Sequence, residues 1–392
     1  MQAVKNQSTE ITRLSEGPKH NFYGYYDLQA WDRDGKNHLV HKVDFADRLP
    51  LKEDKAQLGM INIDNRSYTP IAETTAWNFQ QGSFLQWNPG VPDEVVFNTR
   101  LDEEYRGVIK NIKNNSSRLL DKPVANISPD GRHALSINFD RLFDFRPGYG
   151  YAGRKDVYAD MERPEDDGIF LVNMKTGKSK LIISLCQIHE MLQKQNSPVA
   201  NGKIVINAIS FNTDGSRFVF LVRDFPAQGN TWRTAVMTAN ADGKDMYLLN
   251  DYSLASHYHW RDAEYLLMYA RHKYGDQLYV FKDKTQEIQI VDAGYFLKDG
   301  HCSYSPDRNW ILYDSYPDRE GYRSLYLYNI ANSKGITLAS LYSYPVTTIE
   351  IRCDLHPRWH PSGKAITFDS THENHRHIYH MNLEEVIRTF GG

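Results

Sequence analysis

The chain has 392 residues, which is long enough to bury a large core in two ordinary domains or in one large repeat domain. Its 46 lysine and arginine residues nearly balance 49 aspartate and glutamate residues, and the formal net charge of -3 argues against a nucleic-acid partner. The 3 cysteines are too few for a disulfide framework, and no stretch approaches the roughly 18 apolar residues of a membrane-spanning helix.

The first residues, MQAVKNQSTEITRLSEGPK, are polar and lack the apolar centre of a signal peptide. This pattern predicts a cytoplasmic protein. A periplasmic or secreted protein whose signal peptide had been trimmed would show the same sequence.

A repeated unit runs along the chain. Each copy consists of an aromatic or apolar residue, a turn such as S-P-D-G, and a strand of about six residues with a polar end. In chain order the copies begin at Trp31, Trp87, Ile127, Phe211, Trp260, Tyr304 and Trp359. A second hairpin follows most copies, as in IFLVNMKTGKSKLIIS and AVMTANADGKDMYLLND, whose Thr-Gly and Asp-Gly centres favour tight turns.

Four short strands in each of seven units, with one expected helix near 183–195, predict an all-β, seven-bladed β-propeller with four-stranded antiparallel blades. We expect a single domain over 1–392, with inner strands that start near 31, 87, 127, 211, 260, 304 and 359. The last unit offers about three strands, so the N-terminal segment 9–14 is expected to supply its outer strand and close the ring. The long gap after the third unit predicts an insertion near 141–168 on a blade loop, where function usually resides.

Three adjacent units carry a histidine three residues before their aromatic: His257, His301 and His356. The start of a blade's first strand and the end of its second strand lie on one face of a propeller, so equivalent residues point toward the common axis. We therefore expect the three imidazoles to converge at the channel mouth as a zinc- or manganese-type site. Cys353, in the spacing C-x-x-H with His356, would add a thiolate and make the site a closed, structural one. A purely polar plug of the channel is the alternative.

The polar ends of the second strands lie on this same face: His41, Asp44, Arg100, Asn138, Arg141, Arg223, Arg271, Asp314 and Asp369. The two aspartates at the ends of the sixth and seventh units recur with the repeat and are expected to bond to turns. Several arginines on one concave face suggest an anionic ligand, because guanidinium groups pair bidentately with carboxylate or sulfate. We expect this ligand to contact Tyr23, Tyr25, Asn138, Arg141 and Arg223.

Tyrosine, histidine and arginine around a carboxylated sugar suit β-elimination. The C5 proton of a uronate becomes removable by a histidine or tyrosine once arginine, a metal or a protonated group neutralises the carboxylate, and a second group then protonates the departing O4. Hydrolysis would instead require a carboxylate pair. The sequence contains no G-x-S-x-G elbow, no P-loop and no G-x-G-x-x-G after a strand.

The strings HNFYGYYD, DGHCSYSPDRNWILYDSYPD and RCDLHPRWHPSGKAITFDSTHE resemble those of bacterial propeller polysaccharide lyases. The groups concerned act on ulvan and related rhamnose-uronate glycans, and oligogalacturonate lyase is a more distant relative. As a blade pattern the resemblance covers nearly the whole chain, but sharp motif matches are confined to these three stretches.

This resemblance implies that two histidines about twenty residues apart, a tyrosine and an arginine carry the elimination. His20 and His41 have that spacing, and Arg100 would neutralise the carboxylate. Phe84 stands where the tyrosine is expected, so Tyr149 or Tyr151 would replace it.

The resemblance also implies a structural divalent metal, which we expect to be zinc, held by His257, His301, Cys353 and His356. Two hypotheses follow: a lyase that cleaves a uronate-containing polysaccharide or oligosaccharide, or a non-catalytic propeller that binds a glycan or protein on the same face. The oligomeric state stays open.

Overall fold

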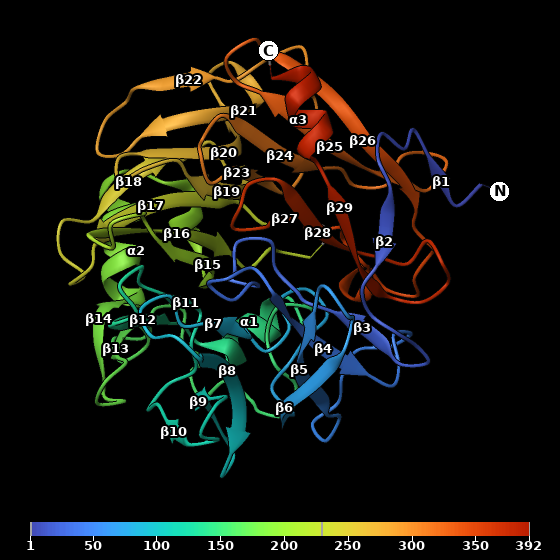
Figure 1. Cartoon of the computed structure of the whole chain (residues 1–392). Coiled ribbons are helices and arrows are strands. Elements are labelled where there is room, and N and C mark those ends of the chain that lie inside the picture. Colours follow the sequence, from blue (N-terminus) through green and yellow to red (C-terminus); the bar gives the residue numbers. More distant parts are fainter. Residues whose placement is uncertain (1, 229, 392) are drawn as a thin grey trace.

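The computed structural model describes residues 2–228 and 230–391, in which seven antiparallel sheets are arranged around a common centre (Figure 1). The predicted seven-bladed β-propeller is therefore confirmed. Both termini lie at the outside of the ring, beside the last two blades (Figure 1).

The strands of each blade are given from the inner to the outer edge. Blade 1 contains β3 (His20–Phe22), β4 (Asn37–Val43), β5 (Ala56–Asn62) and β6 (Tyr68–Thr74). Blade 2 contains β7 (Gln86–Trp87), β8 (Glu94–Leu101), β9 (Glu104–Asn111) and β10 (Ser117–Leu119). Blade 3 contains β11 (Asn126–Ile127), β12 (His133–Ser136), β13 (Gly168–Asn173) and β14 (Ser179–Ser184).

Blade 4 contains β15 (Ile204–Phe211), β16 (Arg217–Asp224), β17 (Thr234–Asn240) and β18 (Tyr247–Asn250). Blade 5 contains β19 (Ala255–Trp260), β20 (Tyr265–His272), β21 (Gly275–Lys282) and β22 (Ile288–Ile290). Blade 6 contains β23 (Cys302–Tyr304), β24 (Trp310–Asp314), β25 (Tyr322–Asn329), β26 (Lys334–Tyr342) and β1 (Val4–Lys5). Blade 7 contains β27 (Arg358–Trp359), β28 (Ala365–Ser370), β29 (His377–Asn382) and β2 (Ile11–Arg13).

The ring is closed by the N-terminal segment, as the sequence predicts. Strand β2 pairs antiparallel with β29 and so forms the outer strand of the last blade. One strand further toward the N-terminus, β1 pairs with β26 and gives blade 6 a fifth strand, which the sequence analysis did not anticipate. The chain therefore fastens two neighbouring blades at one seam.

The inner strands begin earlier than the predicted positions. Trp87, Trp260 and Trp359 are the last residues of their inner strands rather than the first. Trp31 forms only an isolated bridge with His38, and the inner strand of blade 1 is β3. The aromatic and its turn mark the place where the inner strand ends and reverses, which explains the offset.

The middle strands have the composition expected of sheets that are covered on both faces. Strand β16 has the sequence RFVFLVRD and is buried from Phe218 to Asp224, so it shows no alternation of apolar and polar residues. Continuous apolar runs are typical of strands packed on both sides, because each blade lies between two others.

Three α-helices interrupt the strands. The predicted helix near 183–195 is α2 (Leu185–Lys194), and Ser184 and Gln187 form a reciprocal capping box at its start. The sequence pattern does not predict α1 (Phe139–Phe145) or α3 (Glu384–Phe390), because helices of seven residues leave little room for a helical period. Two short 3-10 helices, η1 (Pro198–Asn201) and η2 (Ile349–Ile351), complete the set for the described residues.

The segment 141–168 lies between β12 and β13, and α1 forms its beginning. Arg141 is fully buried and holds this segment: its guanidinium donates to the carboxylate of Asp156 and to the carbonyls of Tyr158, Met161 and Glu162. The insertion is therefore a fixed structure on the channel face. Within residues 2–228 and 230–391, no helix has both the length and the apolar character needed to cross a bilayer.

Candidate functional site

The three histidines predicted at the channel mouth come together. The ring centroids of His257 and His301 lie 3.9 Å apart, and those of His301 and His356 lie 4.2 Å apart. All three side chains are buried. His356 also has a φ of 42°, in the left-handed region that residues with side chains rarely adopt. We call these three residues the histidine cluster.

Two aspartates orient the cluster: Asp314, which is buried, and Asp299, which is partly exposed. Nδ1 of His301 donates to the carboxylate of Asp314 at 2.9 Å, and the backbone N–H of His301 donates to it at 2.7 Å. Nδ1 of His257 donates to Asp299 at 3.0 Å. Because a carboxylate only accepts, these contacts place the proton on Nδ1 and leave a lone pair on each Nε2. Asp314 thus bonds to a histidine, and the expectation that it bonds only to a turn is wrong.

A third aspartate, Asp354, lies beside the cluster. One ligand atom from each of Asp354, His301 and His356 lies within 4.8 Å of the other two. Burial would raise the pKa of Asp354, but Arg352 and Arg323, at 2.7 Å and 2.6 Å from its oxygens, outweigh burial and lower that pKa well below the ordinary value. The carboxylate is therefore ionised.

These groups fit a divalent cation. The Nε2 atoms of His301 and His356 are buried and have no hydrogen-bond partner among the described residues. Two imidazole nitrogens and one carboxylate oxygen are donors that first-row divalent metals accept. A carboxylate on the far nitrogen of a ligand histidine, such as Asp314 on His301, is the usual support of such a site.

Cys353 does not join this group. Its Sγ lies on the opposite side of the segment, where its one hydrogen bond in the described chain is to the carbonyl of Asp354, at 3.8 Å. Neighbouring residues of an extended segment point to opposite sides, so Asp354 faces the histidines and Cys353 faces away. In the candidate site, the carboxylate of Asp354 therefore stands where the sequence predicts the thiolate of Cys353.

A cavity of about 450 Å³ opens beside the histidine cluster, between blades 4 and 5. His257 is the one member of the cluster that lines it. Its walls also carry Tyr25, Tyr149, Tyr269, Tyr316, Trp232, Asp299 and the arginines Arg146, Arg223, Arg233 and Arg271. We call this space the arginine cavity.

Only some of these arginines are free to bind a ligand. Arg271 is paired with Asp276 at 2.7 and 2.9 Å, and Arg233 is paired with Asp224 at 2.6 Å. Arg223 is buried and donates only to neutral acceptors, Asn207 at 3.1 Å and the carbonyl of Ala255 at 3.4 Å.

The charge on Arg223 has no acidic partner, and its Nε–H has no partner among the described residues. Burial, and next the proximity of Arg146, lower the pKa of Arg223 to about 10, so its guanidinium remains charged at neutral pH. A buried, uncompensated positive charge favours an anion in this cavity.

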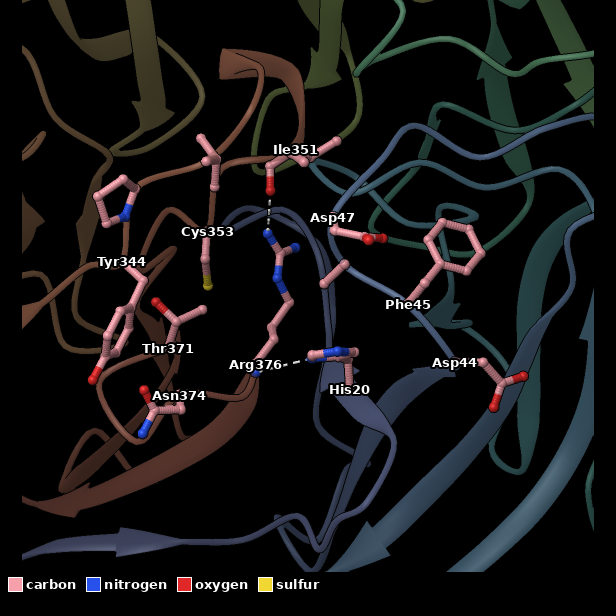
Figure 2. Close-up of a pocket in the computed structure, with 13 residues that line it drawn as sticks. His20, Asp44, Phe45, Asp47, Tyr344, Ile351, Cys353, Thr371, Asn374 and Arg376 are labelled. Carbon is pink, nitrogen blue, oxygen red and sulfur yellow. Dashed lines mark hydrogen bonds between the residues drawn. The ribbon is translucent and has the colours of Figure 1, made fainter.

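The predicted acid/base pair His20 and His41 does not share a cavity. His20 lines a separate cavity of about 390 Å³ with Arg376, Cys353 and Asp47 (Figure 2). Its Nδ1 accepts the backbone N–H of Arg376 at 3.3 Å. Burial, and then His375 and Arg376, lower the pKa of His20.

His41 is completely buried under Phe22, with ring centroids 5.0 Å apart. Its Nε2 accepts the backbone N–H of Ser83 at 3.0 Å, and burial lowers its pKa to about 3. A histidine so enclosed packs the first blade and is not available to a sugar.

Other predicted site residues have structural contacts. Arg100 donates to the carbonyl of Lys52 at 2.7 Å and pairs with Glu53 at 3.2 Å, away from both cavities. Phe84 is buried against Phe139 at a centroid distance of 5.3 Å.

Tyr151 stacks on Phe139 at 4.6 Å and is fully buried, whereas Tyr149 lines the arginine cavity. Asn138 caps α1 and donates to Asp156 and Asp167, so with Arg141 it holds the insertion.

Of the two tyrosines in the predicted ligand set, only one reaches the arginine cavity. Tyr25 lines it, and its ring makes a T-shaped contact with His356 at a centroid distance of 5.1 Å. Tyr23 is buried next to Arg358, whose guanidinium lies 5.1 Å from its ring centroid. Asp369 pairs with Arg358 at 2.7 Å and accepts the backbone N–H of Tyr23 at 3.1 Å.

No protein-family model and no curated protein matches the sequence. Solved structures match over nearly the whole chain. Oligogalacturonate lyase in complex with manganese matches with a TM-score of 0.70 and 14% identity, over 98% of this chain and 96% of that chain. Oligogalacturonate lyase from Vibrio parahaemolyticus matches with a TM-score of 0.68 and 13% identity, over 98% and 97% of the two chains. The tricorn protease matches with a TM-score of 0.53 and 10% identity, over 95% of this chain and 35% of that one.

At these identities the comparisons establish the architecture, a seven-bladed β-propeller like that of oligogalacturonate lyase. This is the more distant of the two relatives that the sequence suggests, and none of the three structures is an ulvan or rhamnose-uronate lyase.

Proposed function

We propose that the protein is a polysaccharide lyase that cleaves a uronate-containing glycan by β-elimination in the arginine cavity. The observation that carries the proposal is the juxtaposition in one cavity of His257, oriented by Asp299, and Arg223, which has no acidic partner within residues 2–228 and 230–391. The structural likeness to oligogalacturonate lyase supports the same reaction class.

Arg223 binds the uronate carboxylate. Two N–H donors of a guanidinium match the two oxygens of a carboxylate, and the buried setting strengthens the charge interaction. Neutralising the carboxylate stabilises the negative charge that develops when the C5 proton leaves.

His257 removes the C5 proton. Its Nδ1–H is held by Asp299, so its Nε2 carries the lone pair that accepts the proton. Burial, and then the neighbouring His301, lower the pKa of His257 while Asp299 opposes them, which keeps the imidazole in its neutral, basic form. Asp299 then stabilises the imidazolium that forms.

Tyr149 donates the proton to the departing O4. Its phenol oxygen accepts Nη2–H of Arg352 at 3.0 Å, and this guanidinium stabilises the phenolate left behind. The C4–O4 bond breaks as a double bond forms between C4 and C5, and no water is consumed.

His301, His356 and Asp354 would hold a divalent cation beside the cavity. When bound, such an ion supplies positive charge that supports a carboxylate or an oxyanion. The fit of these donors and the manganese in the structurally similar lyase support a divalent ion, with manganese and the zinc expected from the sequence as candidates.

The proposed substrate is an acidic oligosaccharide or polysaccharide. The test is a panel of uronides, including oligogalacturonate and ulvan, followed by the ultraviolet absorbance of the unsaturated product. His257→Gln is expected to abolish the signal, and His133→Gln, in β12 away from the cavity, is expected to retain it.

A non-catalytic glycan-binding propeller is the second candidate, and one observation favours it. The residues implied by the lyase resemblance, His20, His41, Arg100 and Phe84, do not meet in a single cavity. Tight binding of a uronide with no unsaturated product from any substrate would support this function and contradict the lyase.

A further inference from the structure

The residues just before β17, Thr231 to Arg233, line the arginine cavity and include an exposed tryptophan. This segment is fixed by Asp224, which accepts the backbone N–H of Arg233 at 2.5 Å and its Nε–H at 2.6 Å. Trp232, next to this clasp, lines the cavity and is 36% exposed. An indole exposed at the wall of a polar cavity offers an apolar surface to a ligand that carries both apolar and polar groups.

Two positive charges flank the indole. The guanidinium carbon of Arg146 lies 5.1 Å from the ring centroid of Trp232, and that of Arg223 lies 5.3 Å from it. Phe145 of α1 contacts it edge-on at a centroid distance of 5.4 Å. The ring is thus held in place from the protein side.

Arg146 lies on the insertion and is itself positioned by Glu350 of η2. Glu350 accepts a hydrogen bond from Nε of Arg146 at 3.4 Å and from the backbone N–H of Gly148 at 3.1 Å. The side chain also lies over Tyr149, 4.2 Å from the ring centroid. Loop, insertion and blade therefore converge on the same indole.

This arrangement has the chemistry of a sugar subsite. The C–H face of a pyranose packs on an aromatic ring, while the polar edges of the sugar bond to donors at the rim of the ring. Arg146 and Arg223, whose guanidinium carbons lie 5.1 Å and 5.3 Å from the ring centroid, supply donors beside the indole and attract a charged sugar.

We infer that Trp232 is a specificity-determining residue that stacks on the sugar ring next to the uronate held by Arg223. The inference rests on the proposed function, in which Arg223 binds the carboxylate of the reacting sugar. In this inference, Trp232 makes the protein bind an oligosaccharide more tightly than a single uronate. Trp232 takes no part in the proton transfers.

The test is calorimetric binding of galacturonate and of its trisaccharide to protein carrying His257→Gln, so that the ligand stays intact. Adding Trp232→Ala is expected to weaken trisaccharide binding about tenfold, since an aromatic contact of about 1.4 kcal/mol is lost. Trp232→Phe is expected to keep most of the affinity. The monosaccharide is expected to bind all variants equally.

Tyr274→Ala is the matched control, because Tyr274 is an exposed aromatic outside the cavity. Melting temperatures check that each variant is folded. Trisaccharide affinity unchanged in Trp232→Ala, or an equal loss for the monosaccharide, would overturn the inference.

The inference and the proposed function fail separately. If the wild type eliminates uronides and Trp232→Ala binds them normally, the inference alone is wrong. If no uronide is cleaved but a neutral trisaccharide binds with the same dependence on Trp232, the stacking role is supported and the lyase is contradicted. If no sugar binds at all, both are contradicted.

Discussion

Nδ1 of His257 in blade 5 lies 3.0 Å from the carboxylate of Asp299, in the segment that precedes blade 6. This contact fixes which imidazole nitrogen carries the proton and therefore which one can act as a base. It joins two neighbouring blades at the wall of the arginine cavity, where Arg223 provides a positive charge that no acidic side chain of the described residues pairs with.

Asp299→Asn is expected to lower kcat on a uronide on the order of 100-fold, with a small change in KM. The amide can present either an N–H or a carbonyl to Nδ1 and cannot stabilise the imidazolium. Steady-state kinetics measure the effect, with Asp160→Asn on the exposed surface of the insertion as the control. Equal kcat values for Asp299→Asn and the wild type would contradict the role of this contact.

Arg223→Lys is expected to reduce kcat/KM on uronides about 100-fold, although the charge is kept. An ammonium group is a point charge and lacks the planar pair of donors that fits a carboxylate. Arg261→Lys, whose guanidinium pairs with Asp262 outside the cavity, is expected to behave like the wild type. A loss of similar size in both variants would show that Arg223 has no special role.

Metal content distinguishes a site formed by histidines and Asp354 from the site with Cys353 that the sequence suggests. We expect elemental analysis to find about one divalent ion per chain in the wild type and to find it lost in His301→Ala and Asp354→Asn. Cys353→Ser is expected to retain the ion, because its Sγ faces away from the cluster. Loss of the ion in Cys353→Ser, with retention in Asp354→Asn, would reverse the assignment.

Acid stability is expected to depend on His41. Its pKa is about 3 in the folded protein against 6.5 for an ordinary histidine, so the unfolded chain binds the extra proton between these values. Stability is therefore complete above pH 6.5 and is lost as the pH falls toward 3, by up to about 1.4 kcal/mol per pH unit.

The measurement for His41 is denaturant unfolding of the wild type and His41→Gln at several pH values between 4 and 7. The free energy of unfolding of the wild type is expected to fall more steeply on acidification. Parallel curves would show that His41 is not a buried neutral imidazole.

The phase of the repeat predicted both the propeller and the histidine cluster. A turn after each aromatic fixes where an inner strand ends, and His257, His301 and His356 hold the same offset from that end. Residues with equal offsets in adjacent blades converge by symmetry, so their meeting could be derived before any side chain was placed. The same reasoning could have placed Asp314. The hairpin pairs the end of β24 with the start of β23, which brings Asp314 next to His301.

The remaining site residues had no such offset. Spacing along the chain brought His20 and His41 to attention, but one faces a cavity and the other faces the blade interior. Arg146 and Trp232 lie on an insertion and a loop, where no period specifies the direction of a side chain. Asp354 was missed because alternation along its extended segment was not applied to its neighbour Cys353.

The most direct test of the lyase assignment is cleavage of oligogalacturonate, followed by mass spectrometry of the fragments. Elimination predicts two fragments whose masses sum to the mass of the substrate, one of them with an unsaturated sugar at its end, and no product from His257→Gln. Fragments whose masses sum to the substrate plus one water molecule would indicate hydrolysis, and undiminished cleavage by His257→Gln would exclude the histidine as the base. Either result would contradict the proposed mechanism.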